Sequence, residues 1–516
     1  MDENSRTRLI RNVIVPLGHE AELGKYLTQK FRHLQIESLK VERRSLDARH
    51  RNHLVWQYNL LVELKGKIPN NPDILEYHTP QPYLTGSRHL QEKHPFIIGS
   101  GPAGLFCALA MVEKGIEPWI FEQGDQIEER DNKVTKFLHG GSLDTESNIQ
   151  FGEGGAGTYS DGKLTSRNRD YYSCKVFEYL VRFGAEETIL TESYPHLGTD
   201  VLKKVIKNLR SYLESRGVLF FWRHQLKDIR VNHGNVCRVL INEMGYVPEV
   251  MILATGNSGR LVYRLLDMQV PMEAKAFAAG FRIEHPQAYL NALFYGEKTD
   301  ISKTGAASYR IKGQFGGRGV YSFCMCPGGL VVNGTSENGG IVTNGMSYSS
   351  RSGKYGNSAL VAQVDQRDFG NEVLSGMKFQ EQIEKKCFEI SKLFVAPGQQ
   401  AQDYLSGKSG NSELKSTFQP GIIKYDLEKI YSPAINNSLK QALTFWEKHY
   451  PGFAREGVLI APETRTSAPL RIMRDHVRLN SLGAENLYPV GEGAGYAGGI
   501  ISSAADGYKT GSIFEH

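Results

Sequence analysis

The stretch Phe96-Ile-Ile-Gly-Ser-Gly-Pro-Ala-Gly104 decides the fold of this chain. Its first three residues predict a short buried strand, and the small and apolar residues that follow, as far as Gly115, predict a helix. A strand, a G-x-G-x-x-G turn and a helix in this order form the fingerprint of a dinucleotide-binding βαβ unit. The stretch therefore predicts a Rossmann-like domain.

Each glycine of the fingerprint has its own role. Gly99 permits the tight turn, Gly101 lets the backbone approach a pyrophosphate, and Gly104 lets the helix pack closely on the strand. The helix N-terminus offers free N–H groups and the positive end of its dipole to the phosphates. We expect the whole turn, including Ser100, Pro102 and Ala103, to contact the cofactor.

A second predicted strand, at residues 118–121, ends at an acidic residue. Glu122 stands where a carboxylate would accept hydrogen bonds from the adenosine ribose, with Gln123 beside it. Arg130 could reach the pyrophosphate, although a solvated helix arginine is the alternative interpretation.

Two later segments indicate which dinucleotide is bound. A buried strand at residues 250–253 ends in Ala254-Thr-Gly256, and a strand at 487–490 enters a glycine-rich turn from Gly491 to Gly495. A simple NAD domain would not need this late return of the chain, whereas a cofactor with a ribityl arm does. The sequence therefore predicts non-covalent FAD. Glu492 would bind ribityl hydroxyls, and Gly498-Gly-Ile500 would begin a helix facing the flavin pyrimidine edge.

These segments carry a resemblance to a known group of proteins. Their order is similar to that of the glutathione-reductase-like superfamily of FAD-binding proteins. More closely, residues 151–163, 282–286, 321–329, 465–467 and 491–499 resemble a bacterial family labelled FAD-dependent, or NAD(FAD)-utilising, dehydrogenase. The match covers nearly the whole chain and implies redox chemistry without naming a substrate. Glu492 departs from the wider superfamily, where Asp is commoner.

The glycine-rich loop at residues 152–162 is expected to lie along the flavin. Such a loop has little side-chain bulk and can offer N–H groups to a flat ring. The resemblance implies that Gly155, Ala156, Gly157 and Thr158 contact the cofactor, with Lys163 near its reactive end. A long surface turn is the alternative.

Three residues are candidates for catalysis: Lys163, His285 and Arg465. His285 is the leading proton donor because imidazole exchanges a proton near neutral pH, although a structural histidine fits the sequence as well. Arg465 and Arg471 could bind an anionic substrate or a reduced flavin, or could form ordinary ion pairs.

Cys324 and Cys326 are the closest cysteine pair in the sequence. Residues two apart in a strand point to the same face, so both sulfurs could face the flavin. A redox dithiol and simple packing of two small side chains are the two interpretations, and the sequence favours packing.

The chain divides into three predicted parts. The fold class is α/β: a three-layer ββα FAD-binding domain, an inserted mostly-β substrate domain and a small α+β, ferredoxin-like module. The module covers residues 1–79, the FAD-binding domain 92–170, 197–270 and 456–516, and the substrate or cap domain 271–455. In the module we expect a strand near Val13, a helix from Glu20 to Phe31, and a strand whose alternate residues from Leu54 to Leu64 are apolar.

Composition narrows the function classes. A net charge of +5 over 516 residues does not favour a nucleic-acid-binding protein. The chain lacks a secretory signal and an apolar membrane span, and its cysteines lack disulfide or zinc spacing, so we expect a cytoplasmic protein with no metal.

The expected partner is a small-molecule substrate. No second G-x-G-x-x-G has strand and helix flanks, so NAD(P)H could act only as a transient electron donor in the substrate cleft. The module could contact a protein partner or a second copy. Two alternatives remain: a flavin-dependent RNA-modifying enzyme and a non-catalytic flavin-binding scaffold.

Overall fold

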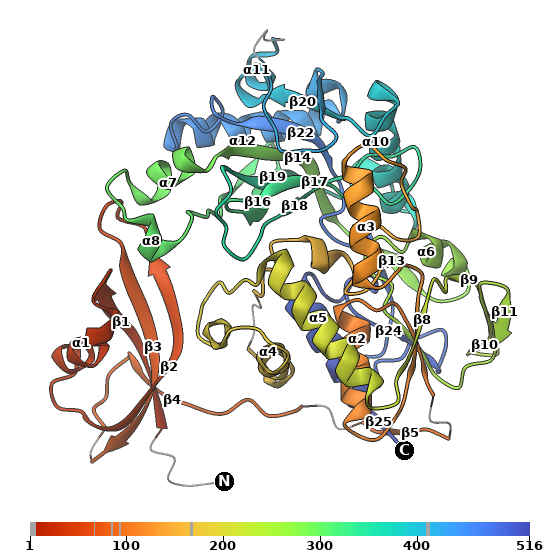
Figure 1. The fold of residues 1–516 in the computed structure, drawn as a ribbon, viewed down its shortest axis with the longest axis horizontal. Helices are drawn as coiled ribbons and strands as arrows, with labels where there is room; N and C mark the ends of the chain where they lie inside the picture. Colours follow the sequence, from red (N-terminus) through yellow and green to blue (C-terminus); the bar gives the residue numbers. More distant parts are fainter. Residues whose placement is uncertain (1–6, 67, 84–85, 92–93, 166–168, 409–412) are drawn as a thin grey trace.

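In the computed structural model, residues 7–66, 68–83, 86–91, 94–165, 169–408 and 413–516 are described. Figure 1 shows a small N-terminal module on one side, a domain with a central parallel sheet, and a cap built on a larger sheet. The first six residues of the predicted module, and positions 92–93 and 166–168 of the predicted FAD-binding domain, lie outside the described residues.

The cofactor domain is built on a five-stranded parallel sheet with the order β24-β12-β6-β7-β8. Its strands are β6 (Phe96–Ile98), β7 (Trp119–Glu122), β8 (Leu219–Trp222), β12 (Met251–Leu253) and β24 (Leu487–Pro489). The outermost strand, β24, comes from the far C-terminal part of the chain, so the domain closes only when that segment returns.

Helices cover one face of this sheet and a second sheet covers the other. The helices are α2 (Pro102–Val112), α4 (Tyr171–Arg182), α5 (Gly198–Glu214) and α13 (Ile500–Gly511). The second sheet contains β9 (Leu226–Asn232), β10 (Asn235–Ile241) and β11 (Met244–Tyr246). Ile97 and Ile120 pack toward the helices, whereas Phe96 and Phe121 pack toward the second sheet, as the alternation of strand side chains requires.

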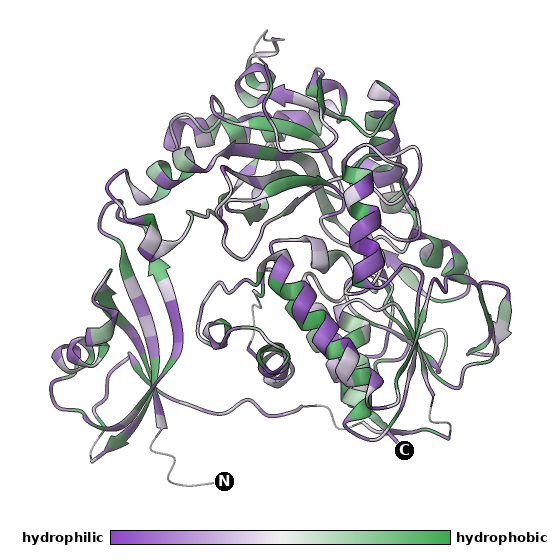
Figure 2. Cartoon of the chain, in the orientation of Figure 1, coloured by the Kyte–Doolittle hydropathy of each residue, from purple (hydrophilic) through white to green (hydrophobic). Residues whose placement is uncertain are grey.

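The hydropathy of the helices follows their burial (Figure 2). Helix α2 is apolar almost all round, because it lies between the sheet and neighbouring helices, whereas α5 has one apolar stripe. Helix α4 lies in residues 171–196, which the predicted domain boundaries omitted. Its Tyr172, Val176 and Leu180 join the same core as α2 and α5, so this segment belongs to the cofactor domain.

The cap is a seven-stranded mixed sheet with the order β15-β16-β19-β14-β22-β20-β21. Its strands are β14 (Phe277–Pro286), β15 (Lys312–Phe315), β16 (Arg318–Cys326), β19 (Tyr355–Val364), β20 (Ala396–Gln400), β21 (Ile422–Lys424) and β22 (Val458–Glu463). Because β22 pairs with β14 and β20, the cap continues beyond the predicted limit at residue 455.

Shorter elements complete the two larger parts. Around the cap sheet lie α7 (Gln287–Tyr295), α8 (Ile301–Thr304), β17 (Leu330–Asn333), β18 (Thr343–Met346), α9 (Gln366–Phe369), α10 (Ser375–Ser391), α11 (Ala401–Ser406) and α12 (Pro433–His449). The other elements are β5 (Arg88–His89), α3 (Ile127–Leu138), α6 (Arg260–Leu266), β13 (Met272–Ala274), β23 (Leu470–Ile472) and β25 (Phe514–Glu515).

The N-terminal module is an antiparallel sheet with one α-helix in its described residues. It contains β1 (Thr7–Pro16), α1 (Leu23–Lys30), β2 (Gln35–Asp47), β3 (Val55–Lys65) and β4 (Ile74–Glu76), in the sheet order β2-β3-β1-β4. Strands β1 and β2 are both antiparallel to β3, which lies between them, so β1-α1-β2 is a split βαβ unit. This is half of the predicted ferredoxin-like pattern.

The module contacts both larger parts of the chain. Arg44 on β2 forms an ion pair with Glu192 at 2.9 Å. Its N–H donates to the Thr191 carbonyl at 2.7 Å. At the tip of the β2–β3 hairpin, the Asn52 N–H donates to the Tyr295 carbonyl at 2.9 Å, and Leu54 packs beside Tyr295 in the cap. The module has an apolar core separate from those of the two larger parts.

We therefore predict that the chain folds without the module. A truncated chain beginning at residue 86 should be soluble and unfold in one cooperative transition, because the main cores of the two larger parts contain no described residue of the module. Thermal unfolding followed by circular dichroism checks this against the full chain. Aggregated material, or a loss of helical signal beyond that of α1, would contradict it.

Candidate active site between the cofactor domain and the cap

One cavity of about 2660 Å³ runs from the fingerprint turn to the cap sheet. Most predicted cofactor-binding residues line it: Gly99, Gly101, Pro102, Ala103, Glu122, Gln123, Gly155, Ala156, Gly157, Ala254, Thr255, Gly256, Glu492, Gly498, Gly499 and Ile500. Ser100, Gly104, Arg130, Thr158 and Gly491 lie behind its wall. Of the catalytic candidates, Lys163 and Arg465 line the cavity and His285 does not.

The fingerprint turn has little room for side chains on its inner side. Gly99 has φ +106°, and a Cβ at Gly104 would lie 2.0 Å from the Gly99 carbonyl oxygen. By contrast, a Cβ at Gly101 would come no nearer than 3.9 Å to any protein atom. Helix α2 begins here without a side-chain cap, so its free N–H groups are directed to the open space beside Gly101. This geometry suits a phosphate group.

Glu122 joins the fingerprint turn to the glycine-rich loop. One carboxylate oxygen accepts hydrogen bonds from the Ser100 N–H and hydroxyl, both at 2.9 Å. The other accepts from the Gly124 N–H at 2.9 Å and the Gly152 N–H at 3.0 Å. A carboxylate has about four lone-pair sites, and these four hydrogen bonds already use them. A ribose hydroxyl would therefore have to share one of the Glu122 oxygens with a protein donor.

Arg130 supports the glycine-rich loop from behind and does not reach the cavity. Its guanidinium is fully buried and donates to the carbonyls of Asn148, Ile149, Glu153 and Gly155 at 2.6–3.0 Å. The predicted contact with the pyrophosphate is therefore wrong, because four backbone acceptors already use its donors. Thr158 is likewise turned inward and donates to the Glu153 carbonyl at 3.2 Å.

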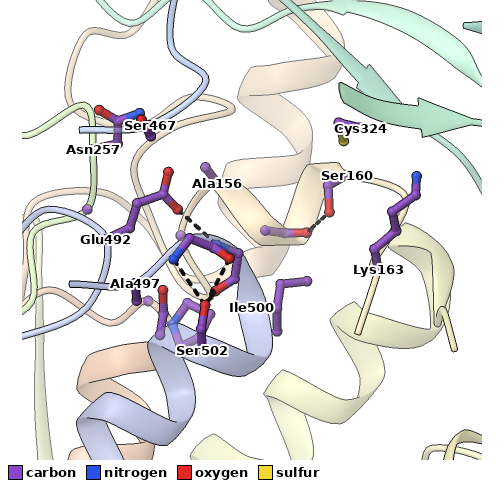
Figure 3. A pocket seen from close by; sticks show the side chains of 18 of the residues that line it. Ala156, Ser160, Lys163, Asn257, Cys324, Ser467, Glu492, Ala497, Ile500 and Ser502 are labelled. Carbon is purple, nitrogen blue, oxygen red and sulfur yellow. Dashed lines mark hydrogen bonds between the residues drawn. The ribbon is translucent and has the colours of Figure 1, made fainter. Parts of the chain in front are cut away.

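The C-terminal turn places a second helix N-terminus at the cavity (Figure 3). Gly498 and Gly499 are exposed and precede α13, and a Cβ at either would meet no atom within 4 Å. The Gly499 N–H donates to a Glu492 carboxylate oxygen at 3.4 Å. Burial raises the pKa of Glu492, and this N–H opposes the shift only in part.

Lys163 stands on the opposite wall, beyond Ala156 and Ser160 in Figure 3. Its ammonium group is 2.9 Å from the fully buried carboxylate of Asp161 and also donates to the Met325 carbonyl of the cap. Burial alone would lower the pKa of Lys163, but Asp161 outweighs this and raises it. The residue is thus a fixed cation that joins the loop to the cap.

Arg465 is a second fixed cation in the cavity wall. It donates to both carboxylate oxygens of Glu384, at 3.1 and 2.8 Å, and to the hydroxyls of Ser258 and Ser336. Arg260 also pairs with Glu384, at 2.7 Å. Arg471, its predicted companion, does not line the cavity and pairs with Glu273 at 2.8 Å.

The proposed role of His285 as proton donor is contradicted. Its side chain is fully buried in the cap, next to the rings of Tyr289 and Phe453, and one ring nitrogen lies 2.8 Å from the Phe453 carbonyl oxygen. Desolvation lowers the pKa of His285 to about 4. The alternation along β14 turns His285 away from the face that carries Arg282 and Glu284.

Sequence reasoning missed Glu463 and the module's contribution to the site. Glu463, at the end of β22, lines the cavity and pairs with Arg282 at 3.1 Å. Arg43, Arg44 and Trp56 of the module also line it. No local motif marks these residues, because strand pairings and domain contacts between distant segments bring them to the cavity.

The chain is similar in sequence to known proteins. Residues 276–466 match a family described as "FAD-dependent protein, C-terminal domain-like". An "Uncharacterized protein" of Clostridium beijerinckii is 39% identical over 496 residues, which cover 93% of this chain and 92% of that protein. The matched segment 276–466 spans the cap sheet and includes β22.

Solved structures show weaker likeness. They include CtdE in complex with FAD (11% identity, TM-score 0.31, 82% of this chain and 83% of that chain). A geranylgeranyl bacteriochlorophyll reductase-like protein of Thermoplasma acidophilum has 11% identity and a TM-score of 0.34 over 80% of this chain and 75% of its own. These TM-scores are too low to assign an activity.

The fold and the cavity define a flavoprotein, and FAD is its cofactor, as the sequence predicts. The chain belongs to the same family as the clostridial protein. The residues of the cavity fit FAD, because no side chain fills the space beside Gly101 or the space in front of the N-termini of α2 and α13. Among the described residues, no helix is long and apolar enough to cross a membrane, and no three His, Cys, Asp or Glu side chains cluster as a metal site.

Two buried carboxylates at the site should give opposite pH dependence of stability. Burial raises the pKa of Glu463 from 4.5 to about 7 although Arg282 opposes the shift. Its contribution to folding is present below pH 4.5 and is lost as the pH rises through 7. Burial would also raise the pKa of Glu384, but Arg260 and Arg465 outweigh it and lower the pKa from 4.5 to about 2. Its contribution is present above pH 4.5 and is lost toward pH 2.

We predict that the unfolding free energy of the wild type falls by up to about 3 kcal/mol as the pH rises from 5 to 8, and that this fall is absent in Glu463→Gln. A fall of similar size as the pH drops below 4.5 should be absent in Glu384→Gln. Urea denaturation of the wild type and both variants over both pH ranges measures how the unfolding free energy changes with pH. Parallel curves for all three proteins would show that neither carboxylate has the assigned pKa.

Proposed function

We propose that this protein is an FAD-dependent oxidoreductase that passes two electrons between flavin N5 and a small organic substrate bound under the cap. The observation that carries the proposal is the single continuous cavity, which joins a phosphate-binding turn to a pocket walled by the cap. A dinucleotide at one end therefore shares space with a substrate at the other. The family proposed is the FAD-dependent, or NAD(FAD)-utilising, dehydrogenases of the glutathione-reductase-like superfamily.

The proposed path of FAD follows the free backbone of the cavity. The adenosine half lies beside Glu122 and Gln123, and the pyrophosphate lies at the N-terminus of α2, next to Gly101. The ring system lies between the loop at Gly155–Gly157 and the N-terminus of α13, whose positive dipole end suits the electron-rich pyrimidine edge. Glu492 would bind the ribityl hydroxyls.

The residues of this chain hold and orient the reactants. FAD, when bound, supplies the two-electron chemistry. Lys163 lines the cavity as a cation fixed by the buried Asp161 carboxylate, so it can meet an anionic substrate without rearranging. Arg465 also lines the cavity, but Glu384, Ser258 and Ser336 use most of its donors, so its part is to hold the wall beside the substrate. Glu463 replaces His285 as our candidate for proton exchange, because it lines the cavity and its pKa of about 7 lets it hold or release a proton near neutral pH.

A nicotinamide donor would have to enter the same cavity. The structure describes one five-stranded parallel sheet of the dinucleotide-binding kind, and it carries the FAD fingerprint. NAD(P)H therefore stays a proposal as a transient donor, with its ring taking the place of the substrate under the cap.

A Gly101→Val variant tests the cofactor site. The backbone at Gly101 (φ −73°) accepts any side chain, and nothing in the protein would clash with Cβ. The side chain would instead occupy the space of the pyrophosphate. We expect FAD affinity to fall at least about 100-fold, or about 3 kcal/mol, measured as FAD released per chain on denaturation and by titration of the stripped protein.

Gly24→Val provides the matched control, because Gly24 lies in α1 of the module and its Cβ would also meet nothing within 4 Å. It should keep full FAD occupancy. Full occupancy in Gly101→Val, with wild-type circular dichroism in both variants, would overturn the assignment of the fingerprint turn.

A further inference from the structure

Cys324 lines the cavity and Cys326 does not, although strand alternation predicts that both face the same side. The pairing of β16 with β19 shifts register between Phe323 and Cys326, and Cys324 has φ +45°. This bulge turns Cys324 into the cavity, whereas Cys326 is fully buried behind it. The two cysteines therefore have different surroundings: one sulfur is accessible from the cavity and the other is enclosed.

The bulge also brings the two side chains together. The Cys326 thiol donates to the Cys324 carbonyl oxygen, with its Sγ at 3.3 Å. A flat strand would hold residues two apart near the long end of disulfide Cα separations. The bulge at Cys324 breaks the flat strand geometry on which this objection depends.

Two cations lie against the pair. Arg282 is fully buried, and its Nη2 donates to the Cys324 carbonyl at 2.6 Å and to the Cys326 Sγ at 3.4 Å. Lys163 binds the carbonyl of Met325, the residue between the two cysteines. The hydrogen bond from Cys326, followed by the charges of Lys163 and Arg282, lowers the pKa of the Cys324 thiol although burial opposes this. A cation beside a thiol favours the reactive thiolate.

Other buried cysteines of the chain lack these features. Cys107 in α2 and Cys387 in α10 do not line the cavity, and burial raises the pKa of both thiols. They behave as small apolar side chains. Packing therefore explains Cys107 and Cys387, but it does not explain why Cys324 faces a cavity between the fully buried Arg282 and Lys163 of the cavity wall.

We propose that Cys324 and Cys326 form a redox-active dithiol that exchanges two electrons with FAD, and that Cys324 is the sulfur that meets a small disulfide or thiol in the cavity. This inference rests on the proposed function, because it requires the flavin ring at Ala156 and Ile500, in the same pocket as Cys324 (Figure 3). Cys326 is the enclosed partner that completes the intramolecular disulfide.

In the reductive direction the Sγ–Sγ bond between Cys324 and Cys326 breaks, and each sulfur gains one electron and one proton. The two electrons and two protons would come from reduced FAD. A small disulfide then accepts these electrons from the dithiol by thiol–disulfide exchange, which restores the Cys324–Cys326 bond and releases two small thiols.

Anaerobic titration of the FAD-bound protein tests the proposal. After oxidation with hydroxyethyl disulfide and removal of the reagent, dithionite should deliver about four electrons per chain to the wild type and about two to Cys324→Ser and Cys326→Ser. Thiols counted in denaturant should fall from six to about four in the oxidised wild type. Cys237→Ser is the matched control, since Cys237 is exposed on β10, and it should still take up about four electrons.

Each outcome decides one claim. Uptake of about two electrons by every protein, with six thiols still counted in the oxidised wild type, would overturn the dithiol and leave the flavin function intact. Flavin that dithionite does not reduce would instead count against the proposed function. A thiol loss that persists in Cys324→Ser, or that disappears in Cys237→Ser, would assign oxidation to other cysteines and also overturn the proposal.

Discussion

The carboxylate of Glu122 accepts four hydrogen bonds from residues that are far apart in the sequence, and the cavity depends on them. Ser100 belongs to the fingerprint turn, Gly124 follows β7, and Gly152 opens the glycine-rich loop. A buried carboxylate without such donors would be costly. These hydrogen bonds hold the turn and the loop against each other.

Buried guanidinium groups also join distant segments of the chain in and behind the cavity wall. Arg130 holds four loop carbonyls, Arg282 joins β14 to β22 through Glu463, and Arg465 joins the C-terminal segment to α10 through Glu384. Removing either member of a buried ion pair leaves an uncompensated charge that costs about 3 to 5 kcal/mol. The Arg465–Glu384 pair gives the wall fixed charges, whereas a pKa of about 7 lets Glu463 gain or lose its charge near neutral pH.

The sequence predicts the cofactor domain well, because local patterns carry its information. Strand β6, the glycine turn, α2 and the late return at β24 all lie where the patterns indicate. It predicts the cap poorly: β22 was assigned to the wrong domain, since strand pairing is not written in local periodicity. The errors at Arg130 and His285 have a related cause. Residue type suggests a role, but only packing shows which side of a loop or strand a side chain faces.

The bulge at Cys324 shows the same limit at a single residue. Alternation predicts two equivalent sulfurs, whereas one residue at positive φ separates an accessible thiol from an enclosed one. Glu463 was missed because its environment, not its neighbours in sequence, raises its pKa toward neutrality. Chemistry of this kind depends on distant pairings, such as β14 with β22, that a single sequence does not reveal.

A crystal structure of the FAD-bound protein tests the central claim most directly. We expect the pyrophosphate at the N-terminus of α2 beside Gly101, and the flavin ring between the Gly155–Gly157 loop and the start of α13, with Cys324 facing it. A flavin ring outside this pocket, for example against Arg43 and Trp56 of the module, would contradict the placement on which the proposed chemistry depends.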